Sequence, residues 1–235
     1  MAKRAAKHPT STEPDARPVS SGPGFLTLVS IPQLIPLFPL PNVVLFPQMP
    51  MPLHVFEPRY KKMVEDALRE HQFIGMSLLQ PGWEPHYHDR PPIYAVGCAG
   101  RIEQCEPVDN GRYNILLRGV TRFRIREERE GEPYRLALVE PLSDGVGDDA
   151  SLEELRKRLL AALAKSADGP TTLVLQDELP HEIFVNALCQ DMKLTPVERQ
   201  SLLDCDTVVG RCTRLLEILD FLFLEQTYGK NRSVH

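Results

Sequence analysis

The sequence predicts an α+β fold in which an antiparallel β-rich region, residues 25–142, precedes a helical region, residues 143–235. Two observations carry this prediction. Residues 25–142 alternate short apolar runs with turn residues, whereas beyond Ala150 the apolar period changes from two to 3.6. A third observation concerns proline: the chain has 22 prolines in 235 residues, and eight of them lie between Pro32 and Pro58. Prolines at this density favour short, interrupted strands over long ones.

Residues 1–24 are predicted to form a disordered tail, because they contain almost no large apolar side chain. They also lack the apolar core of a secretory signal, and no run in the chain approaches the ~18 apolar residues of a membrane span. The five cysteines form no C-x-x-C pair, so we expect them to be reduced, mostly buried thiols. These observations together predict a cytoplasmic protein.

The β-rich region contains one predicted helix, which begins at Pro58 and carries an apolar stripe at helical spacing. A short apolar strand, 73–79, follows it. From Ile93 the pattern predicts a β-meander with turns at 109–111, near Gly119 and at 130–132. The predicted strands of the meander are 93–106, 113–117, 122–128 and 134–140.

About four helices are predicted in the second region. The first opens with a capping-box signature, 151–154, and carries a leucine stripe from Leu152 to Leu163. The second begins near Pro180, and the third begins with another capping box at Thr195. Asp206 is the predicted cap of a last, longer helix.

The charge and the known catalytic patterns exclude several classes of function. The formal net charge is −5, and the helical region is the more acidic part, which argues against nucleic acid as its partner. The phosphate-binding pattern G-x-x-x-x-G-K-[ST] does not occur, and the segment 181–185 lacks the second histidine of a metalloprotease helix. We therefore predict no enzymatic activity and no cofactor.

Two polar clusters remain as candidate sites. His86 and His88, with Asp89, are weak candidates for a metal site, and surface histidines without a metal are the favoured interpretation. Arg122, Arg124 and Arg126 alternate with apolar residues, so on a strand their guanidinium groups would share one face. That face would be either a solvated strand surface, which we favour, or a stripe that binds anions or RNA.

The proline-rich stretch carries a family resemblance. The runs PLFPLPNVVLFP, residues 36–47, and MPLHVFEPRY, residues 51–60, closely resemble the opening of the Lon protease N-terminal, or Lon substrate-binding, domain family. The segment 119–125, GVTRFRI, and the closing segment 198–216 are also similar to that family. The resemblance covers about residues 31–225.

The resemblance implies a PUA-like β-rich pseudo-barrel joined to a helical lobe, with no catalytic residues in the domain. It also marks a set of motif positions, for most of which we favour a structural role. Phe46, Phe56 and Phe123 are expected in the core. Glu57, Arg59 and Tyr60 are expected to be interlocked by hydrogen bonds at the corner between strand and helix, whereas His54 stays open between a structural and a binding role. For a binding surface we predict exposed apolar side chains in a groove, with Met49, Met51 and Trp83 as candidates. The motif positions are Pro39, Phe46, Pro47, His54, Phe56, Glu57, Pro58, Arg59, Tyr60, Gly119 and Phe123.

The predicted function is that of a stand-alone, non-catalytic Lon N-domain-like module that binds unfolded or tagged polypeptides, as an adaptor in protein quality control. Its predicted partners are polypeptide substrates or another protein, not a membrane, and nucleic acid is not favoured. The alternative is that the PUA-like lobe binds nucleic acid or a small ligand through Arg122, Arg124 and Arg126.

Overall fold

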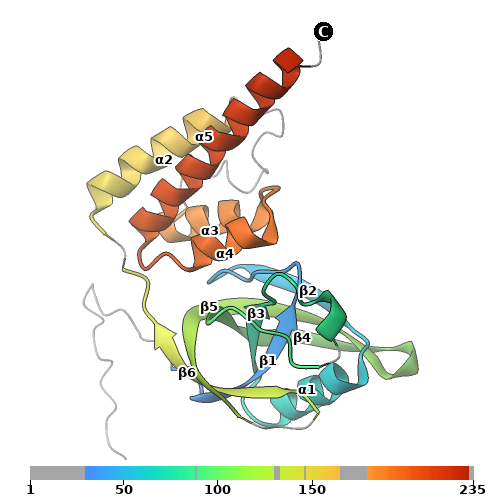
Figure 1. Ribbon diagram of the computed structural model, residues 1–235. Helices are drawn as coiled ribbons and strands as arrows, with labels where there is room; N and C mark the ends of the chain where they lie inside the picture. The colour runs from blue at the N-terminus through green and yellow to red at the C-terminus, as the bar shows by residue number, and fades with distance from the viewer. Residues whose placement is uncertain (1–29, 88, 130–132, 146, 165–178, 233–235) are drawn as a thin grey trace, which may run out of the picture.

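The computed structural model describes residues 30–87, 89–129, 133–145, 147–164 and 179–232, with side chains up to Leu224. Six strands form a β-rich lobe, and four helices form a second lobe above it in Figure 1. The predicted tail, 1–24, and the predicted turn at 130–132 lie outside the described residues. No helix within the described part of the chain is long and apolar enough to span a membrane.

The β-rich lobe is one mixed sheet that closes on itself. Its strand order is β2-β5-β4-β3-β1-β6, and an additional pairing of β5 with β6 completes a barrel, with β2 attached outside it. All pairs are antiparallel except β1 with β3. These two strands are parallel because the connection between them, through β2 and α1, crosses over and returns the chain in the same direction. The strands are β1 (Leu34–Leu40), β2 (Pro50–Val55), β3 (Phe73–Leu78), β4 (Val96–Val108), β5 (Arg112–Arg129) and β6 (Arg135–Leu142).

Strand β5 differs from the prediction, which placed a turn near Gly119. Its 18 residues run without interruption through that glycine. Its first half pairs with β2 and its second half with β6, while β4 follows the other side. Gly119 is needed for close approach: a Cβ atom there would lie 2.0 Å from the carbonyl oxygen of Phe46. The glycine therefore marks a crossing of two chain segments.

The prolines of β1 lie inside the sheet. Pro36 falls in the half of β1 that pairs with β6, and Pro39 falls in the half that pairs with β3. The two pairings overlap only at Leu37, so each half of the strand has one side without a paired neighbour. A residue without an N–H group is tolerated beside such an unpaired side.

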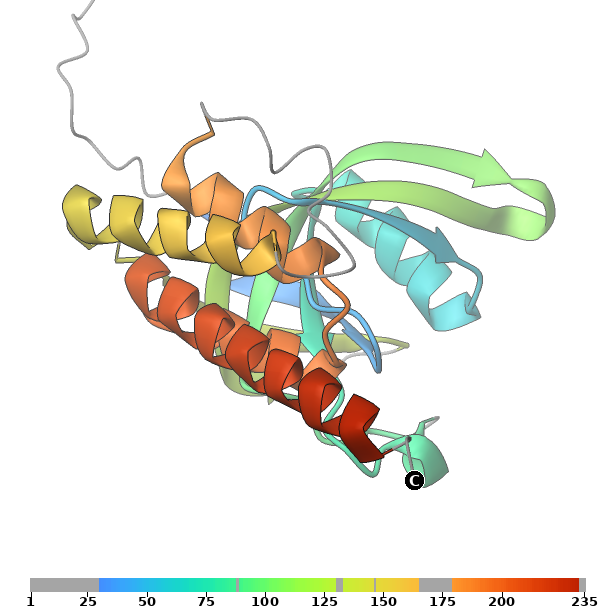
Figure 2. The ribbon, with the colours of Figure 1, turned by 90° about the horizontal axis from the view of Figure 1, so that it is seen from above.

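The helix α1 (Pro58–Arg69) begins at the predicted proline and buries Tyr60, Met63, Val64 and Ala67. The tip of the β4–β5 hairpin has the predicted turn, where Asn110 adopts a left-handed backbone with φ of 64°. Figure 2 shows this hairpin extending away from the barrel, with β2 and α1 beside it. Two short 3₁₀ helices, η1 (Glu84–His86) and η2 (Asp109–Gly111), complete this lobe.

The four predicted helices of the second lobe are confirmed, but two of their caps differ. α2 starts earlier than predicted, because the side chain of Asp148 accepts a hydrogen bond from the Ser151 N–H at 2.8 Å. α5 is capped by Thr207 rather than Asp206, since the Thr207 hydroxyl accepts from the Gly210 N–H at 2.9 Å. The predicted capping box at Thr195 is present. The helices are α2 (Asp149–Leu163), α3 (His181–Asp191), α4 (Pro196–Leu203) and α5 (Val208–Arg232).

The helices are stacked in two layers on the barrel. α3 and α4 lie against the β-rich lobe, and α2 and α5 lie side by side above them (Figures 1 and 2). A small apolar cluster that includes Phe123 fills the barrel. A larger cluster extends from β-lobe residues such as Phe46 to helical residues such as Phe184. The two lobes thus share one apolar core, while the division at residue 142 stays a prediction.

Candidate functional site

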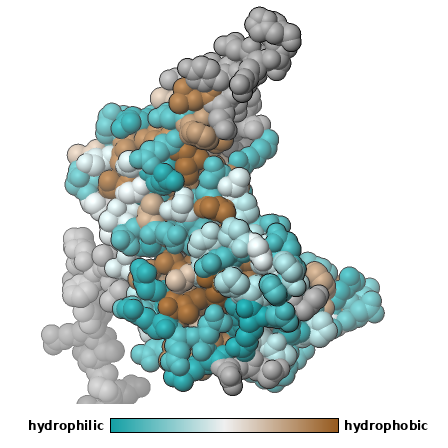
Figure 3. Space-filling view, viewed as in Figure 1, coloured by the Kyte–Doolittle hydropathy of each residue, from teal (hydrophilic) through white to brown (hydrophobic). Residues whose placement is uncertain are grey.

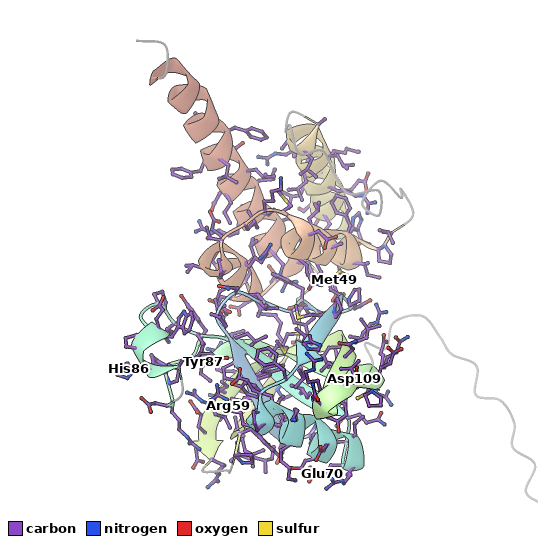
Figure 4. All side chains as sticks on the ribbon, turned by 90° about the vertical axis from the view of Figure 1, so that its right-hand side faces the viewer. Met49, Arg59, Glu70, His86, Tyr87 and Asp109 are labelled. Atoms are coloured by element: carbon purple, nitrogen blue, oxygen red, sulfur yellow. The ribbon has the colours of Figure 1, made fainter. Side chains whose placement is uncertain are left out.

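A groove lies between the two lobes, where strand β5 crosses the segment that leads into β2. Its volume is about 610 Å³. Figure 3 shows the outline of the molecule narrowing between the lobes, with apolar surface on both. Figure 4 places Met49 at this boundary, directly below the helices. The lining residues are Gln48, Met49, Pro50, Arg118, Gly119 and Val120 from the β-rich lobe, and Ile183, Ala187, Gln190 and Asp191 from α3.

Hydrogen bonds from α3 hold the two walls of the groove together. The Gln190 side chain donates to the Pro50 carbonyl at 2.7 Å and accepts from the Phe46 N–H at 3.2 Å. The buried Asn186 side chain donates to the Pro47 carbonyl at 3.1 Å. Because prolines interrupt regular strand pairing in this segment, the side chains of α3 supply partners for its backbone groups. The groove is therefore a pre-formed feature.

The chemistry of the groove is an apolar floor with a polar rim. We call its buried and half-buried apolar side chains, Met49, Val120 and Ile183, the floor. The more exposed charged side chains, Arg118 and Asp191, form the rim. Arg118 donates to Glu103 at 2.9 Å and to the Gln48 carbonyl at 3.1 Å. A cavity of this size with a few polar groups suits a large apolar side chain and the backbone that carries it.

The three residues predicted to bind through exposed apolar side chains have different positions. Met49 lines the groove, although only 7% of it is exposed. Met51 is equally buried, and both methionines belong to the core cluster, so the prediction of an exposed side chain is wrong for both. Trp83 is half-buried beside η1, with its ring edge-on to Tyr87 at a centroid distance of 5.5 Å. The structure does not bring the three together in one groove.

The exposed face of three arginines on β5, which both the favoured solvated surface and the alternative binding stripe required, does not form. Arg122 is only 1% exposed, since it points into the helical lobe, whereas Arg124 is half-buried and Arg126 is exposed and paired with Glu140. A bulge between Ile125 and Glu127 also breaks the alternation. The loss of this shared exposed face removes the observation on which the nucleic-acid alternative rested.

Arg122 instead belongs to a buried charge network between the lobes. Its Nε atom is bonded to Asp144, and its Nη1 atom donates to the Leu203 carbonyl at 3.0 Å. Arg211, which is fully buried, donates to both Asp144 oxygens at 3.1 Å and to Asn186 at 2.6 Å. Burial by itself would lower the pKa of Arg211, but the neighbouring Asp144 carboxylate raises it above its usual value. The network fixes the link between β6 and α2.

The motif residues at the start of α1 form the predicted interlocked corner. Glu57 accepts hydrogen bonds from Arg59 at 3.1 Å and from the Tyr87 hydroxyl at 2.5 Å. The Arg59 guanidinium lies over the rings of Tyr60 and Tyr87, at 4.6 and 5.2 Å from their centroids. Burial and the bond to Glu57 raise the pKa of Tyr87. Figure 4 shows Arg59 and Tyr87 near each other and away from Met49, so this corner is not part of the groove.

The other motif positions are divided between the core and the surface. Phe46 and Phe123 are fully buried, as predicted. Phe56 is 60% exposed, so its predicted place in the core is wrong, because it follows the last paired residue of β2. His54 is exposed and shares a hydrogen bond with Asn114 at 2.7 Å. Pro39 lies in β1, Pro47 precedes the groove and Pro58 starts α1.

Neither histidine candidate gains support as a metal ligand. His86 is exposed, and its ring Nδ1 lies 3.4 Å from the Asp89 carboxylate, while His88 lies outside the described residues. Within the ranges that the structure describes, no three His, Cys, Asp or Glu side chains gather into a group that could hold a metal ion. Cys98, Cys189 and Cys212 are buried free thiols.

Sequence reasoning missed the α3 wall of the groove. The sequence places Ile183 and Ala187 on the apolar face of a helix, and this periodicity alone cannot distinguish a core position from a groove position. Gln190 and Asn186 carried no signal, because their partners lie about 140 residues earlier in the chain. Asp144 and Arg211, likewise, are brought together only by the packing of the lobes.

Comparison with known proteins agrees with this architecture. The chain is 29% identical over 221 residues to the Lon protease of Dictyoglomus thermophilum, covering 86% of this chain and 27% of that protein. It is 25% identical over 206 residues to Lon protease 2 of Myxococcus xanthus, covering 84% of this chain and 25% of that protein. The chain thus spans about a quarter of the length of the relatives it matches.

Two solved structures have the same fold. The Lon N-terminal domain protein from Xanthomonas campestris superposes with a TM-score of 0.55 at 26% identity, covering 78% of this chain and 97% of that one. The N-terminal domain of the Mycobacterium avium complex Lon protease gives a TM-score of 0.56 at 19% identity, with 79% and 97% covered. The family model of the ATP-dependent protease La (LON) substrate-binding domain matches residues 34–220, and the chain belongs to that family.

Proposed function

We propose that this chain is a non-catalytic module that binds unfolded or tagged polypeptides in the groove between its lobes and acts as an adaptor in protein quality control. The observation that carries the proposal is the groove itself, a cavity of about 610 Å³ with an apolar floor and a polar rim. Membership of the substrate-binding domain family supports a recognition role. The adaptor role rests on the family's association with an ATP-dependent protease.

The groove suits an unfolded polypeptide for a physical reason. Folded proteins bury their large apolar side chains, whereas unfolded chains expose them. Ile183 and Val120 are half-buried and offer such a side chain an apolar contact at both walls. Burying one large apolar side chain contributes about 1.5–3 kcal/mol to binding. A Kd of 1 mM corresponds to about 4 kcal/mol, so capture needs further contacts beside this side chain.

The direct test is a binding comparison between an unfolded and a folded form of one protein. A reduced and carboxymethylated model protein is crosslinked to the chain, and its native form is used in parallel. We expect crosslinks to form with the unfolded protein and to map to α3 and the β5 crossing. Equal failure with the folded and unfolded forms would sink the proposal.

A matched pair of variants separates the groove from general surface hydrophobicity. Ile183→Ser removes an apolar contact from the groove, whereas Val197→Ser removes one from an exposed site on α4, where Val197 is 49% exposed. We expect Ile183→Ser to weaken binding of the unfolded protein by about tenfold or more, and Val197→Ser to leave it unchanged. Thermal unfolding curves of both variants check that the fold is retained. Equal binding by both variants would place recognition elsewhere.

A further inference from the structure

The strand that borders the groove has a free edge. Strand β2 stands at the end of the sheet order and, among the described strands, pairs only with β5, whereas the other five strands close into the barrel. A free strand edge is the usual place where an extended polypeptide adds itself to a sheet by backbone hydrogen bonds. Whether β2 can accept such a strand depends on which backbone groups face outward.

The hydrogen bonds at the crossing determine that direction. The Gly119 N–H donates to the Met49 carbonyl at 2.9 Å, and the Gly119 carbonyl accepts from the Gln48 N–H at 2.8 Å. Odd-numbered residues of β5 therefore turn their backbone groups toward β2. With the register Met51 to Leu117, the odd-numbered residues of β2 face β5 and the even-numbered residues face outward.

The outward-facing positions of β2 are Pro50, Pro52 and His54. Proline has no N–H group, so two of the three outward donors are missing. The Pro50 carbonyl, in addition, already accepts from Gln190 at 2.7 Å. An added strand would find a single backbone donor, at His54, on this edge.

We infer that the groove recognises polypeptides by their side chains and not by strand addition. The edge of β2 that borders the groove cannot extend the sheet, because Pro50 and Pro52 have no N–H group to donate. This inference rests on the proposed function and deepens it by defining the substrate class. The occupant is a polypeptide segment with a large apolar side chain, bound without a backbone ladder. Segments that are helical or irregular then bind as well as extended ones.

Charge at the rim adds a second feature to this substrate. Asp191 is exposed, is the last residue of α3 and makes no ion pair with another described residue. α3 has no basic residue in its last turn, so the negative end of the helix and the carboxylate reinforce each other. Arg118, by contrast, is already bonded to Glu103. A lysine or arginine next to the apolar side chain is the complementary neighbour.

The first experiment measures how a fluorescein-labelled peptide, GSKLFLGSG, binds to the full chain by anisotropy. N-methylation of both leucine backbone nitrogens removes donors that a ladder would use, and we expect the Kd to change by less than about threefold. Replacing the three apolar side chains by serine should raise the Kd at least about tenfold. A peptide with glutamate in place of the lysine should bind the wild type more weakly than the original peptide does. The Asp191→Asn variant should bind both peptides equally. If N-methylation abolished binding although the peptide keeps all its side chains, the inference would be overturned.

The second experiment tests the closed edge without any peptide. Pro50→Val with Pro52→Val restores the two N–H groups, and Pro85→Val is the control, since Pro85 is exposed in η1 outside the sheet. We expect faster sedimentation of the double variant with rising concentration, but not of the control. Unchanged sedimentation of the double variant would overturn the edge closure. Absence of peptide binding to the wild type, with association of the double variant, would contradict the proposed function and leave the closed edge supported.

Discussion

Two neighbouring residues of β5, Phe123 and Arg122, pack into two regions of opposite chemical character, one apolar and one charged. Phe123 points into the barrel, whose interior is apolar and closely filled. Arg122 points toward the helices and joins the charge network around Asp144. Both side chains are at most 1% exposed, so one strand is buried on both faces. A buried strand therefore need not be apolar on both sides.

The two regions also obtain their specificity differently. In the barrel, space is the constraint: a Cβ atom at Gly97 would lie 2.6 Å from the Phe123 ring and 2.4 Å from the Met76 carbonyl oxygen. Between the lobes, pairing is the constraint, because two buried arginines share one carboxylate. In the barrel an added group meets occupied space, whereas between the lobes the loss of the carboxylate leaves two buried charges without their partner.

The largest effect is expected from Asp144→Ala. It leaves Arg122 and Arg211 buried without their carboxylate, so we expect the free energy of unfolding to fall by about 3–5 kcal/mol. Urea denaturation followed by circular dichroism measures this change. The control is Asp206→Ala, because the Asp206 side chain is exposed and only its backbone carbonyl contacts Arg122. Equal, small losses in both variants would show that the network does not hold the lobes.

Gly97→Ala tests the barrel interior. The added methyl group must displace Phe123 or the β3 backbone, so we expect a loss of about 1–3 kcal/mol in the same denaturation experiment. Gly210→Ala is the comparison, because a Cβ atom at Gly210 would have the Thr207 hydroxyl as its nearest neighbour, at 3.1 Å, and because this residue lies in a helix. A Gly97→Ala protein as stable as the wild type would mean that the barrel is looser than its geometry indicates.

Thr195→Ala distinguishes a local helix effect from a network effect. The substitution removes the capping box of α4, and we expect a loss of about 1 kcal/mol. The Leu203 carbonyl at the other end of α4 accepts from Arg122, so the network could transmit the change. Measured with Asp144→Ala in a double-mutant cycle, the two losses should add to within about 0.5 kcal/mol. A larger coupling would extend the network to the whole of α4.

The smallest effect concerns thiol reactivity at pH 8. Burial raises the pKa of Cys98 to about 12 and that of Cys212 to about 11, so both thiols stay protonated in the folded state. We expect Cys105 and Cys205, which are half-buried, to react with a thiol-specific chromogenic reagent, and the other three to react only after unfolding. The same difference in pKa makes stability depend on pH. The unfolded chain releases its thiol protons at a lower pH than the folded chain, so the free energy of unfolding should fall as the pH rises above about 9. Reaction of all five native thiols would contradict this burial.

Much of the local structure could be predicted from residue patterns. The helix at Pro58, the turn at Asn110 and the capping box at Thr195 follow from local propensity, and the structure confirms them. The turn at Gly119 was wrong, because a glycine that permits close approach of another segment looks the same in sequence as one that permits a turn. Phe56 was wrong since periodicity does not reveal where strand pairing ends.

The α+β class, the presence and order of the helices, and the family follow from the amino-acid sequence, because they depend on periodicity, capping and motif order along the chain. Three features required the folded structure: β5 is one strand, Arg122 is buried, and α3 forms a wall of the groove. These features depend on contacts between residues far apart in the chain, such as Arg122 with Leu203 and Gln190 with Phe46. No local pattern encodes such pairings.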